Sequence, residues 1–268
     1  MFKRQASSVK PHAEVGEREI VVVADPEALA REAVARVARA AEAAVVRAGR
    51  FTIALAGGST PKRLYELLAT APYAPRLPWE RTHVFWGDER AVAPDHPDSN
   101  FGMARAALLS RVPVPGGQIH RMAAERNDRD AAAQEYETAI AQTFGASLGG
   151  NPPAFDLVLL GMGADGHTAS LFPHTEALRE TRRWVVRNSV PKLKADRLTM
   201  TAPLLNWSSS VLFLVVGADK ATTLKEVLEG KPDPERLPSQ LIRPLMGQVA
   251  WLLDEPAASR LVQRGASP

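Results

Sequence analysis

The sequence predicts an α/β protein with a doubly wound, mostly parallel sheet that carries helices on both faces. Short β-branched runs alternate with longer segments in which Ala and Leu recur at helical spacing. Several of the runs, such as DLVLLG and VLFLVVG, are apolar at every position rather than at every second one. Such strands are buried on both faces, and βαβ alternation is typical of a doubly wound open sheet.

The expected elements follow in chain order. The expected strands are Ile20–Ala24, Phe51–Ala56, His83–Trp86, Asp156–Gly161, Trp184–Arg187, Leu198–Thr201, Val211–Val216 and Val249–Leu253. The expected helices are Pro26–Ala48, Pro61–Leu68, Ser99–Leu109, Asp130–Phe144 and Ala218–Glu229. Ligands of such sheets bind at the carboxyl ends of the strands. A site is therefore expected in the loops after Ala56, Trp86, Gly161 and Arg187.

We expect one domain over residues 19–262, because no Gly/Ser/Pro-rich linker separates two self-contained halves. Residues 1–18 are polar, lack the apolar stretch of a signal peptide and are expected to be a disordered lead-in; residues 263–268 are expected to be a tail. No apolar run approaches the roughly 20 residues of a membrane span. These features predict a cytoplasmic protein without a membrane partner.

Composition excludes several classes of site. The chain has 268 residues and no Cys, which excludes disulfides, thiolate zinc sites, iron–sulfur clusters and a Cys nucleophile. The formal net charge is +3, and the basic residues are scattered along the chain. A nucleic-acid partner is therefore not indicated.

The segment FTIALAGGSTPKRLYELL predicts a phosphate site after the second strand. Gly57 and Gly58 let a ligand approach the main chain closely. Ser59 or Thr60 suits the N-cap of the next helix, with Pro61 at its first position. Backbone N–H groups, two hydroxyls and the positive end of a helix dipole then surround one point. The alternative is an ordinary strand-to-helix turn that binds nothing, and no Walker loop is present.

The segment HVFWGDERAVAPDHPDSNFGM turns from apolar to charged at the end of the third strand. Asp88 can accept hydrogen bonds from sugar hydroxyls, and Arg90 can pair with a phosphate or a developing negative charge. Ser99 is expected to cap the next helix. The alternative is a solvated charge cluster.

The segment DLVLLGMGADGHTASLFPH presents Asp165 and His167 on a Gly-rich turn after the fourth strand. A His near its ordinary pKa is a natural general base, and a nearby carboxylate can fix its tautomer. The alternative is a His that caps the following helix. The G-x-G-x-x-G match that starts at Gly161 and includes Gly163 is a weaker indication of a dinucleotide site, because Asp165 would face a pyrophosphate.

The basic stretch VPKLKADRLTMTAPLLN offers Lys192, Lys194 and Arg197, of which one or two are expected to face the crevice and bind a phosphate. A solvated turn is the alternative, most of all for Lys194. His174 matches no metal motif and is expected to be structural. The absence of G-x-S-x-G argues against a serine-hydrolase elbow.

Four segments, in this order, resemble the 6-phosphogluconolactonase family: AGGSTPKRLYELL, VFWGDERAVAPDHPDSNFGMARAALL, FDLVLLGMGADGHTASLFPHT and VPKLKADRLTMTAPLLN. They span about Phe51 to Asn206. The resemblance implies a fold shared with glucosamine-6-phosphate deaminase, ribose-5-phosphate isomerase and CoA transferases. In the deaminase pattern, Asp-Gly-His is followed by Ile-Ala-Phe-Asn-Glu-Pro. The Glu of that pattern is missing from DGHTASLFPH, so the lactonases are the nearer relatives.

The resemblance also implies roles for residues. His167 becomes the catalytic base, with Asp165 and Arg90 beside it. The loop of Gly57, Gly58, Ser59 and Thr60 binds the phosphate together with Lys192 and Arg197, while Asp88 and Gly163 also face the substrate. The implied reaction is hydrolysis of 6-phospho-D-glucono-1,5-lactone to 6-phospho-D-gluconate, the second step of the oxidative pentose-phosphate pathway. The functional neighbours would be glucose-6-phosphate dehydrogenase and 6-phosphogluconate dehydrogenase.

Such a reaction needs no metal and no cofactor, because a lactone is already an activated ester. The oxyanion would be stabilised by Arg90 or by backbone N–H groups of the Gly163–His167 turn. The competing interpretations are a sugar-phosphate isomerase or amino-sugar deaminase on the same scaffold, a non-catalytic sugar-phosphate sensor and a nicotinamide dehydrogenase.

Overall fold

The main sheet contains six parallel strands in the order β1-β9-β8-β5-β2-β3. This computed structural model describes residues 18–262, so the expected lead-in (apart from Arg18) and the C-terminal tail lie outside the described residues. The strands are β1 (Arg18–Val23), β2 (Phe51–Leu55), β3 (Thr82–Trp86), β5 (Leu157–Leu160), β8 (Ser210–Val215) and β9 (Gln248–Asp254). The parallel sheet expected from the continuously apolar runs is confirmed.

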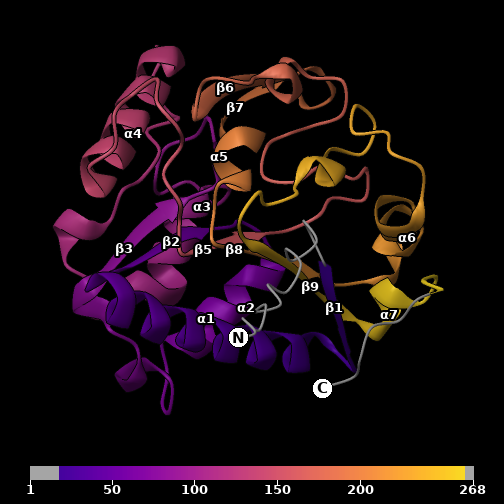
Figure 1. Cartoon of the computed structure of the whole chain (residues 1–268), viewed down its shortest axis with the longest axis horizontal. Helices are drawn as coiled ribbons and strands as arrows, with labels where there is room; N and C mark the ends of the chain where they lie inside the picture. The colour runs from indigo at the N-terminus through magenta and orange to yellow at the C-terminus, as the bar shows by residue number, and fades with distance from the viewer. Residues whose placement is uncertain (1–17, 263–268) are drawn as a thin grey trace, which may run out of the picture.

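Helices cover both faces of the main sheet. One face packs against α1 (Pro26–Ala48), α2 (Ser59–Leu68) and α3 (Asn100–Ala104); the other packs against α4 (Arg129–Phe144), α5 (Ala202–Asn206), α6 (Ala221–Glu229) and α7 (Glu255–Ala258). Successive side chains of β2 alternate between the two, because Ile53 and Leu55 pack on the α1 side and Ala54 packs on the α4 side. Figure 1 shows α1 and α2 beneath the sheet and α4 and α5 above it.

The direction in which strands are added changes between β2 and β5. From β2 the chain crosses to β3 at one edge, whereas β5 is followed by β8 and β9 toward the other edge. Such a switch point leaves a crevice at the carboxyl ends of the strands. The loops after β2, β3, β5 and β8 all reach this edge.

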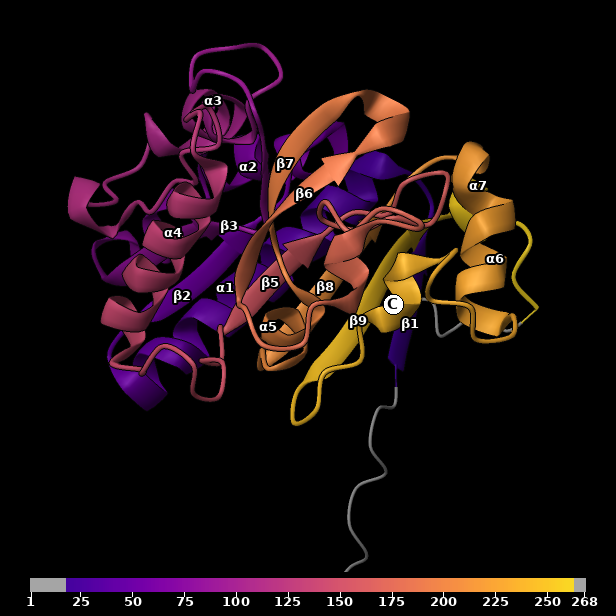
Figure 2. The same ribbon diagram turned by 90° about the horizontal axis from the view of Figure 1, so that it is seen from above.

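A separate antiparallel sheet stands over the carboxyl ends of the main sheet, in the order β4-β7-β6. Its strands are β4 (Asp88–Arg90), β6 (Val185–Val190) and β7 (Ala195–Met200). Figure 2 shows the β6–β7 ribbon lying over β5 and β8. Placing Trp184–Arg187 and Leu198–Thr201 in the alternating βα pattern was therefore wrong. Only a short turn joins the two strands, and a parallel connection needs a dozen or more residues.

Helix boundaries agree closely with the expected ones except near the crevice. The segment Arg105–Leu109 continues α3 as a π-helical turn. Short 3₁₀ turns occupy Ala74–Arg76, Trp79–Arg81, Gly116–Gln118, Glu176–Arg179, Pro191–Leu193, Ala218–Lys220 and Pro238–Leu241. Within residues 18–262, none of the helices has the length and apolar character needed to cross a bilayer.

Candidate active site

A cavity of about 290 Å³ opens at the switch point, between the ends of β2, β3, β5 and β8. Eight of the residues singled out in the sequence line it: Gly57, Gly58, Ser59, Thr60, Asp88, Arg90, Gly163 and His167. The glycine-led loop and the imidazole, about 110 residues apart in the chain, therefore share one cavity. Asn100 and Lys220, which the sequence analysis did not assign to the site, also line it.

The phosphate loop differs from expectation in where its helix begins. The N-cap is Gly58, in a conformation with φ +102° that favours glycine, and α2 begins at Ser59. Ser59 and Thr60 are thus the first helical residues rather than caps, and Pro61 is third. The N–H groups of a first helical turn have no partner within the helix. The N–H groups of Ser59 and Thr60 are therefore available at the cavity, at the positive end of the α2 dipole.

Two buried tyrosines hold the strand ends on which the cavity is built. The Tyr65 hydroxyl accepts from Ala56 N at 2.9 Å and donates to Ala56 O at 2.8 Å. The Tyr136 hydroxyl does the same at Trp86, at 2.8 and 3.2 Å. Burial raises the pKa of both phenols, so both stay protonated. Each hydroxyl thus satisfies backbone groups at the carboxyl end of a strand: those of Trp86, the last residue of β3, and those of Ala56, the first residue after β2.

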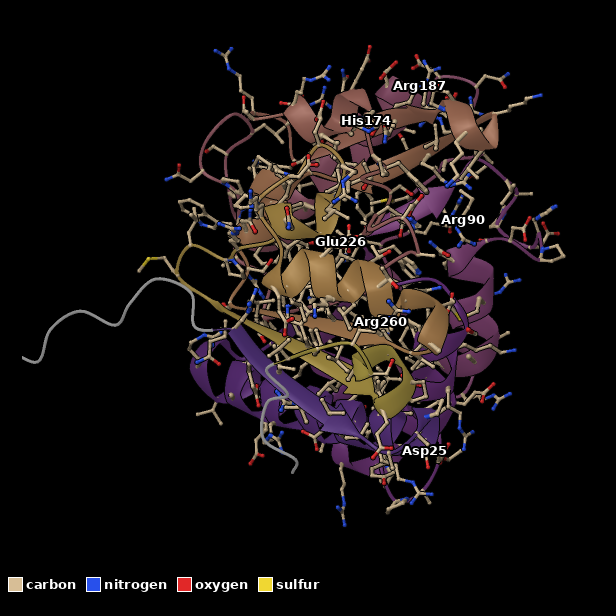
Figure 3. The ribbon with its side chains drawn as sticks, turned by 90° about the vertical axis from the view of Figure 1, so that its right-hand side faces the viewer. Asp25, Arg90, His174, Arg187, Glu226 and Arg260 are labelled. Carbon is tan, nitrogen blue, oxygen red and sulfur yellow. The ribbon has the colours of Figure 1, made fainter. Side chains whose placement is uncertain are left out.

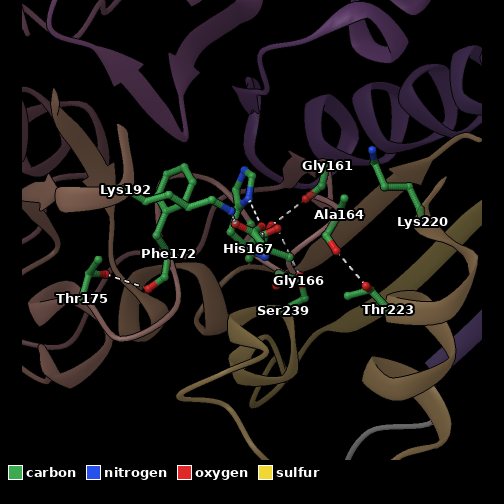
Figure 4. A network of polar contacts seen from close by, with 12 residues as sticks. Gly161, Ala164, Gly166, His167, Phe172, Thr175, Lys192, Lys220, Thr223 and Ser239 are labelled. Atoms are coloured by element: carbon green, nitrogen blue, oxygen red, sulfur yellow. Dashed lines mark hydrogen bonds and ion pairs between the residues drawn. The ribbon is translucent and has the colours of Figure 1, made fainter. Parts of the chain in front are cut away.

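Asp165 lies between His167 and Lys192. His167 Nδ1 donates to Asp165 Oδ1 at 2.5 Å, and Lys192 Nζ donates to Asp165 Oδ2 at 3.1 Å (Figure 4). The hydrogen bond from His167 is the main reason that the pKa of Asp165 lies well below its usual range, and Lys192 lowers it further. The ionised carboxylate fixes the proton of the imidazole on Nδ1, which leaves Nε2 as the basic nitrogen.

The turn that carries this pair needs glycine at position 163. A Cβ atom there would lie 2.0 Å from His167 Nδ1 and 2.8 Å from Asp165 Oδ1. Three N–H groups of the turn are already used: Gly163 N donates to His167 O at 2.9 Å, Gly166 N donates to Gly163 O at 3.0 Å, and His167 N donates to Asp165 Oδ1 at 3.3 Å. Few backbone donors therefore remain for an oxyanion.

The imidazole of His167 is stacked on the ring of Phe172, with 4.1 Å between centroids and 21° between planes. The ring is thus held by a carboxylate at one nitrogen and by an aromatic face. His174, two residues beyond Phe172, has φ +60° and its N–H donates to Glu235 O at 3.0 Å. It does not line the cavity and is exposed, so its structural role stays a prediction.

The segment Asp88–Arg90, expected as a charged loop, is instead strand β4 with both carboxylates buried. Asp88 Oδ2 accepts from the Ser170 hydroxyl at 2.6 Å. Glu89 accepts from the backbone N–H groups of Arg90, Asn100 and Phe101, each at 2.8 Å. Burial raises the pKa of Glu89, and these N–H groups oppose the rise. Ser99 caps α3 as expected, since its hydroxyl accepts from Gly102 N at 3.0 Å.

Arg90 and Arg197 stand on paired positions of β4 and β7. Arg90 donates to Asp98 O at 2.5 Å and Arg197 to Asp196 O at 3.1 Å, and within residues 18–262 neither forms an ion pair with a carboxylate. Burial and then the charge of Arg90 lower the pKa of Arg197. Arg90 lines the cavity, whereas Arg197 does not. Figure 3 shows Arg90 apart from Arg187, which lies on the outer side of the small sheet.

The lysine that lines the cavity is not one of those that the sequence predicted. Lys192 meets Asp165 and does not line the cavity, with 71% of its side chain exposed. Lys194 is an exposed turn residue with φ +49°. Lys220 lies on the opposite wall, in the turn after β8, where it also pairs with Asp219. The run VLFLVVG marks β8 as a strand as buried as β5. The residues after Gly217, which follow its carboxyl end, are therefore site candidates on the same ground as those after Gly161.

No group of three or more His, Asp or Glu side chains in the described part of the chain is placed to hold a metal ion. The polar groups of the cavity are instead an imidazole, a buried carboxylate, a buried amide, two cations, hydroxyls and helix N–H groups. This set suits an anionic, hydroxylated ligand that undergoes proton transfer.

Comparisons with known proteins agree with this geometry. The family profile described as Glucosamine-6-phosphate isomerases/6-phosphogluconolactonase matches residues 24–251. A curated 6-phosphogluconolactonase from a Nostoc species is 50% identical over 213 residues, 80% of this chain and 85% of that protein. The structure of 6-phosphogluconolactonase from Trypanosoma cruzi superposes with a TM-score of 0.81 at 30% identity, over 94% of this chain and 100% of that one. A monomeric glucosamine-6-phosphate deaminase shares the fold, with a TM-score of 0.74 at 22% identity, over 91% of this chain and 100% of that one.

Proposed function

Because the chain belongs to the family of glucosamine-6-phosphate isomerases and 6-phosphogluconolactonases, we propose that it hydrolyses 6-phospho-D-glucono-1,5-lactone to 6-phospho-D-gluconate. The observation that carries the proposal is that the Gly57–Thr60 loop and His167 line a single cavity. The Gly57–Thr60 loop suits a phosphate, and His167 suits proton transfer. The substrate carries a phosphate and its hydrolysis requires proton transfer, so the cavity meets both requirements.

The phosphate binds at the start of α2 in this proposal. The N–H groups and hydroxyls of Ser59 and Thr60 donate to its oxygens, and Lys220 supplies a positive charge from the facing wall. Lys192 and Arg197 were expected in this role. The contact of Lys192 with Asp165 favours a different one, in which its charge keeps Asp165 ionised.

His167 acts as general base on the water that attacks C1. Nε2 takes a proton from the water as the new C–O bond forms, and the tetrahedral intermediate then collapses. The bond from C1 to the ring oxygen breaks, and the ring oxygen receives the proton from His167 as it leaves. Asp165 stabilises the imidazolium between these steps through Nδ1.

Arg90 is the proposed partner of the oxyanion on C1. It lines the cavity with His167, and within the described residues no carboxylate pairs with it. The alternative donors, the N–H groups of the Gly163–His167 turn, are mostly committed to hydrogen bonds within the turn. A charged donor in a partly closed site stabilises an oxyanion more strongly than a neutral one.

The proposed reaction uses no metal and no cofactor. The lactone carbonyl is already activated, and the donor set of the cavity, one imidazole and one carboxylate that Ser170 already binds, is poor in metal ligands. In a pathway the enzyme would take its lactone from glucose-6-phosphate dehydrogenase and pass its product to 6-phosphogluconate dehydrogenase.

A coupled assay tests the function. Glucose-6-phosphate dehydrogenase generates the lactone, and its disappearance is followed with and without this protein and with EDTA. We expect EDTA-resistant acceleration over spontaneous hydrolysis, and His167→Ala should lower kcat by about 10²–10⁴-fold. His174→Asn is the matched control, because Asn tolerates the left-handed backbone at that position.

Two results would contradict the proposal. Near-normal turnover by His167→Ala, after correction for spontaneous hydrolysis, would remove His167 from the role of base. Release of ammonia from glucosamine 6-phosphate, without lactone hydrolysis, would favour the deaminase instead.

A further inference from the structure

The side-chain amide of Asn100 is buried in the wall of the cavity and only half satisfied. Asn100 is 1% exposed and lines the cavity. Its Nδ2 donates to Asp88 O at 2.9 Å and lies 3.4 Å from Asp88 Oδ1. Its Oδ1 is buried and has no hydrogen-bond partner among the described residues. A buried acceptor without a donor is destabilising, so such an atom calls for an explanation.

The orientation of this amide follows from its neighbours. Both groups next to Nδ2 are acceptors, so the reverse orientation would bring oxygen against oxygen. Oδ1 therefore points away from Asp88 and lies against the backbone of Gly57. A Cβ atom at position 57 would come within 1.8 Å of it. The free oxygen is thus placed between the β4 wall and the start of the phosphate loop.

The backbone of Asn100 is held independently of its side chain. Buried Glu89 accepts from the N–H groups of Asn100 and Phe101, both at 2.8 Å, and from the Ser99 hydroxyl at 3.2 Å. None of these contacts uses the side-chain amide of Asn100. The side-chain amide therefore stands on a fixed backbone in the cavity wall, and its removal leaves the anchor of α3 intact.

We propose that Asn100 Oδ1 accepts a hydrogen bond from a ring hydroxyl of the substrate and so selects for it. This inference rests on the proposed function. The phosphate dianion, the carbonyl oxygen and the ring oxygen of the lactone are acceptors only, so they cannot satisfy Oδ1. The hydroxyls on C2, C3 and C4 are the donors that the substrate offers, and they lie between the phosphate and C1.

Deoxy substrates test this inference. The 6-phosphorylated lactones of 2-, 3- and 4-deoxyglucose are prepared by oxidising the corresponding sugar phosphates, and kcat/KM is measured against the parent lactone. For one of the three, the wild-type protein should lose about ten- to a hundredfold, because Oδ1 is left unpaired. Asn100→Ala should be slow on the parent lactone and show little further loss on that deoxy substrate.

Asn188→Ala is the matched control. Asn188 is also 1% exposed, also donates through Nδ2 to a backbone carbonyl and also has an unpartnered Oδ1, but it does not line the cavity. It should keep the wild-type preference for the hydroxyl. Asn100→Leu, which fills the volume without an acceptor, replaces Asn100→Ala if thermal unfolding shows that the alanine variant does not fold.

The inference is overturned if, for all three deoxy lactones, the preference of the Asn100 variant equals that of the wild type within about twofold. It is also overturned if Asn188→Ala removes the preference as Asn100→Ala does. Failure of the wild-type protein to hydrolyse even the parent lactone would instead contradict the proposed function, so the two failures are distinguishable.

Discussion

Gly163 controls how closely Asp165 and His167 approach each other. Replacing Gly163 with Ala puts a methyl group 2.0 Å from His167 Nδ1, so the imidazole must move. Because displacement of a catalytic group by about 1 Å costs on the order of 10²-fold in rate, kcat should fall by about that factor. Steady-state kinetics of the lactonase reaction measure it.

Gly117→Ala is the control for this substitution, since a Cβ atom there meets nothing within 4 Å. Its kcat should match that of the wild type. A Gly163→Ala enzyme with unchanged kcat would mean that the hydrogen bond between Asp165 and His167 is not needed for turnover.

Lys220 is the residue that best separates binding of the phosphate from the chemistry at C1. Lys220→Met should raise KM by about 10–100-fold and change kcat less, because a charge-assisted contact with the phosphate is lost. Inhibition by inorganic phosphate should weaken in parallel. Lys225→Met, on the outer part of α6 with 44% of its side chain exposed, is the control and should change neither. A drop in kcat alone would place Lys220 at C1 instead.

Residues whose roles depend only on near neighbours in the chain were predictable from the sequence. Asp165 and His167 are two positions apart on one turn, so their contact follows from local geometry. The positions of Arg197, Lys192 and Asn100 depend instead on how the small antiparallel sheet and α3 pack on the main sheet. No local pattern reports that packing, and Arg197 and Lys192 consequently do not line the cavity where they were expected to.

At the scale of elements, the two tyrosine hydroxyls hold the ends of β2 and β3. Tyr65→Phe and Tyr136→Phe should each lower the free energy of unfolding by about 1–3 kcal/mol, because buried N–H and C=O groups of Ala56 or Trp86 lose their partner. Tyr65→Phe should also raise KM, since Ala56 directly precedes the phosphate loop. Urea unfolding and steady-state kinetics measure the two effects.

Tyr73→Phe uses the remaining tyrosine of the chain as a control, because Tyr73 is only partly buried. It should be neutral in both measurements. If all three variants were equally stable, the hydroxyls of Tyr65 and Tyr136 would not contribute to the free energy of unfolding.

Long, strongly apolar elements were predictable and short charged ones were not. Helix α1 begins and ends where its pattern predicts, between the Asp25 cap and Gly49. Strand β4 was missed because Asp-Glu-Arg has none of the apolar residues that mark a buried strand. Its burial is possible only because Ser170 and the N–H groups of α3 satisfy its carboxylates. The start of α2 was predicted at Pro61 because Ser and Thr are preferred as N-cap residues. The N-cap is Gly58 instead, so the helix begins at Ser59.

At the scale of the whole molecule, a histidine pair makes stability depend on pH. His83 Nδ1 lies 3.3 Å from His120 Nε2, and His120 is stacked on buried Phe85. Burial lowers the pKa of both, that of His120 to about 4. The unfolded chain therefore binds protons between about pH 6.5 and 4 that the folded chain does not bind. The free energy of unfolding should fall as the pH falls through that window.

Urea unfolding at a series of pH values checks this, with His120→Asn beside the wild type. The variant should have a shallower slope, and the exposed His96→Asn control should keep the wild-type slope. The difference should stay below about 1.4 kcal/mol per pH unit, because both rings are partly exposed and solvent screens them. Identical slopes in His120→Asn and wild type would assign the pH dependence to other groups.

The doubly wound arrangement was predictable because it is repeated many times along the chain. Six strands rich in apolar residues, several of them apolar at nearly every position, and the helices between them all indicate the same architecture. The second sheet was not predicted, because β6 (VVRNSV) and β7 (ADRLTM) were placed in the same alternating pattern as the other strands, although polar residues interrupt both and only a short turn joins them.

The pairing of β1 with β9 has a consequence for the order in which the chain folds. Among the described residues, β1 is the first strand and its neighbour β9 is the last, with Arg18 aligned to Val249. During synthesis β1 cannot dock on β9 until the chain has grown by the 231 positions that separate Arg18 from Val249. Of the strand pairs in the main sheet, β1 and β9 are the farthest apart in sequence. Their pairing therefore belongs among the late steps of folding.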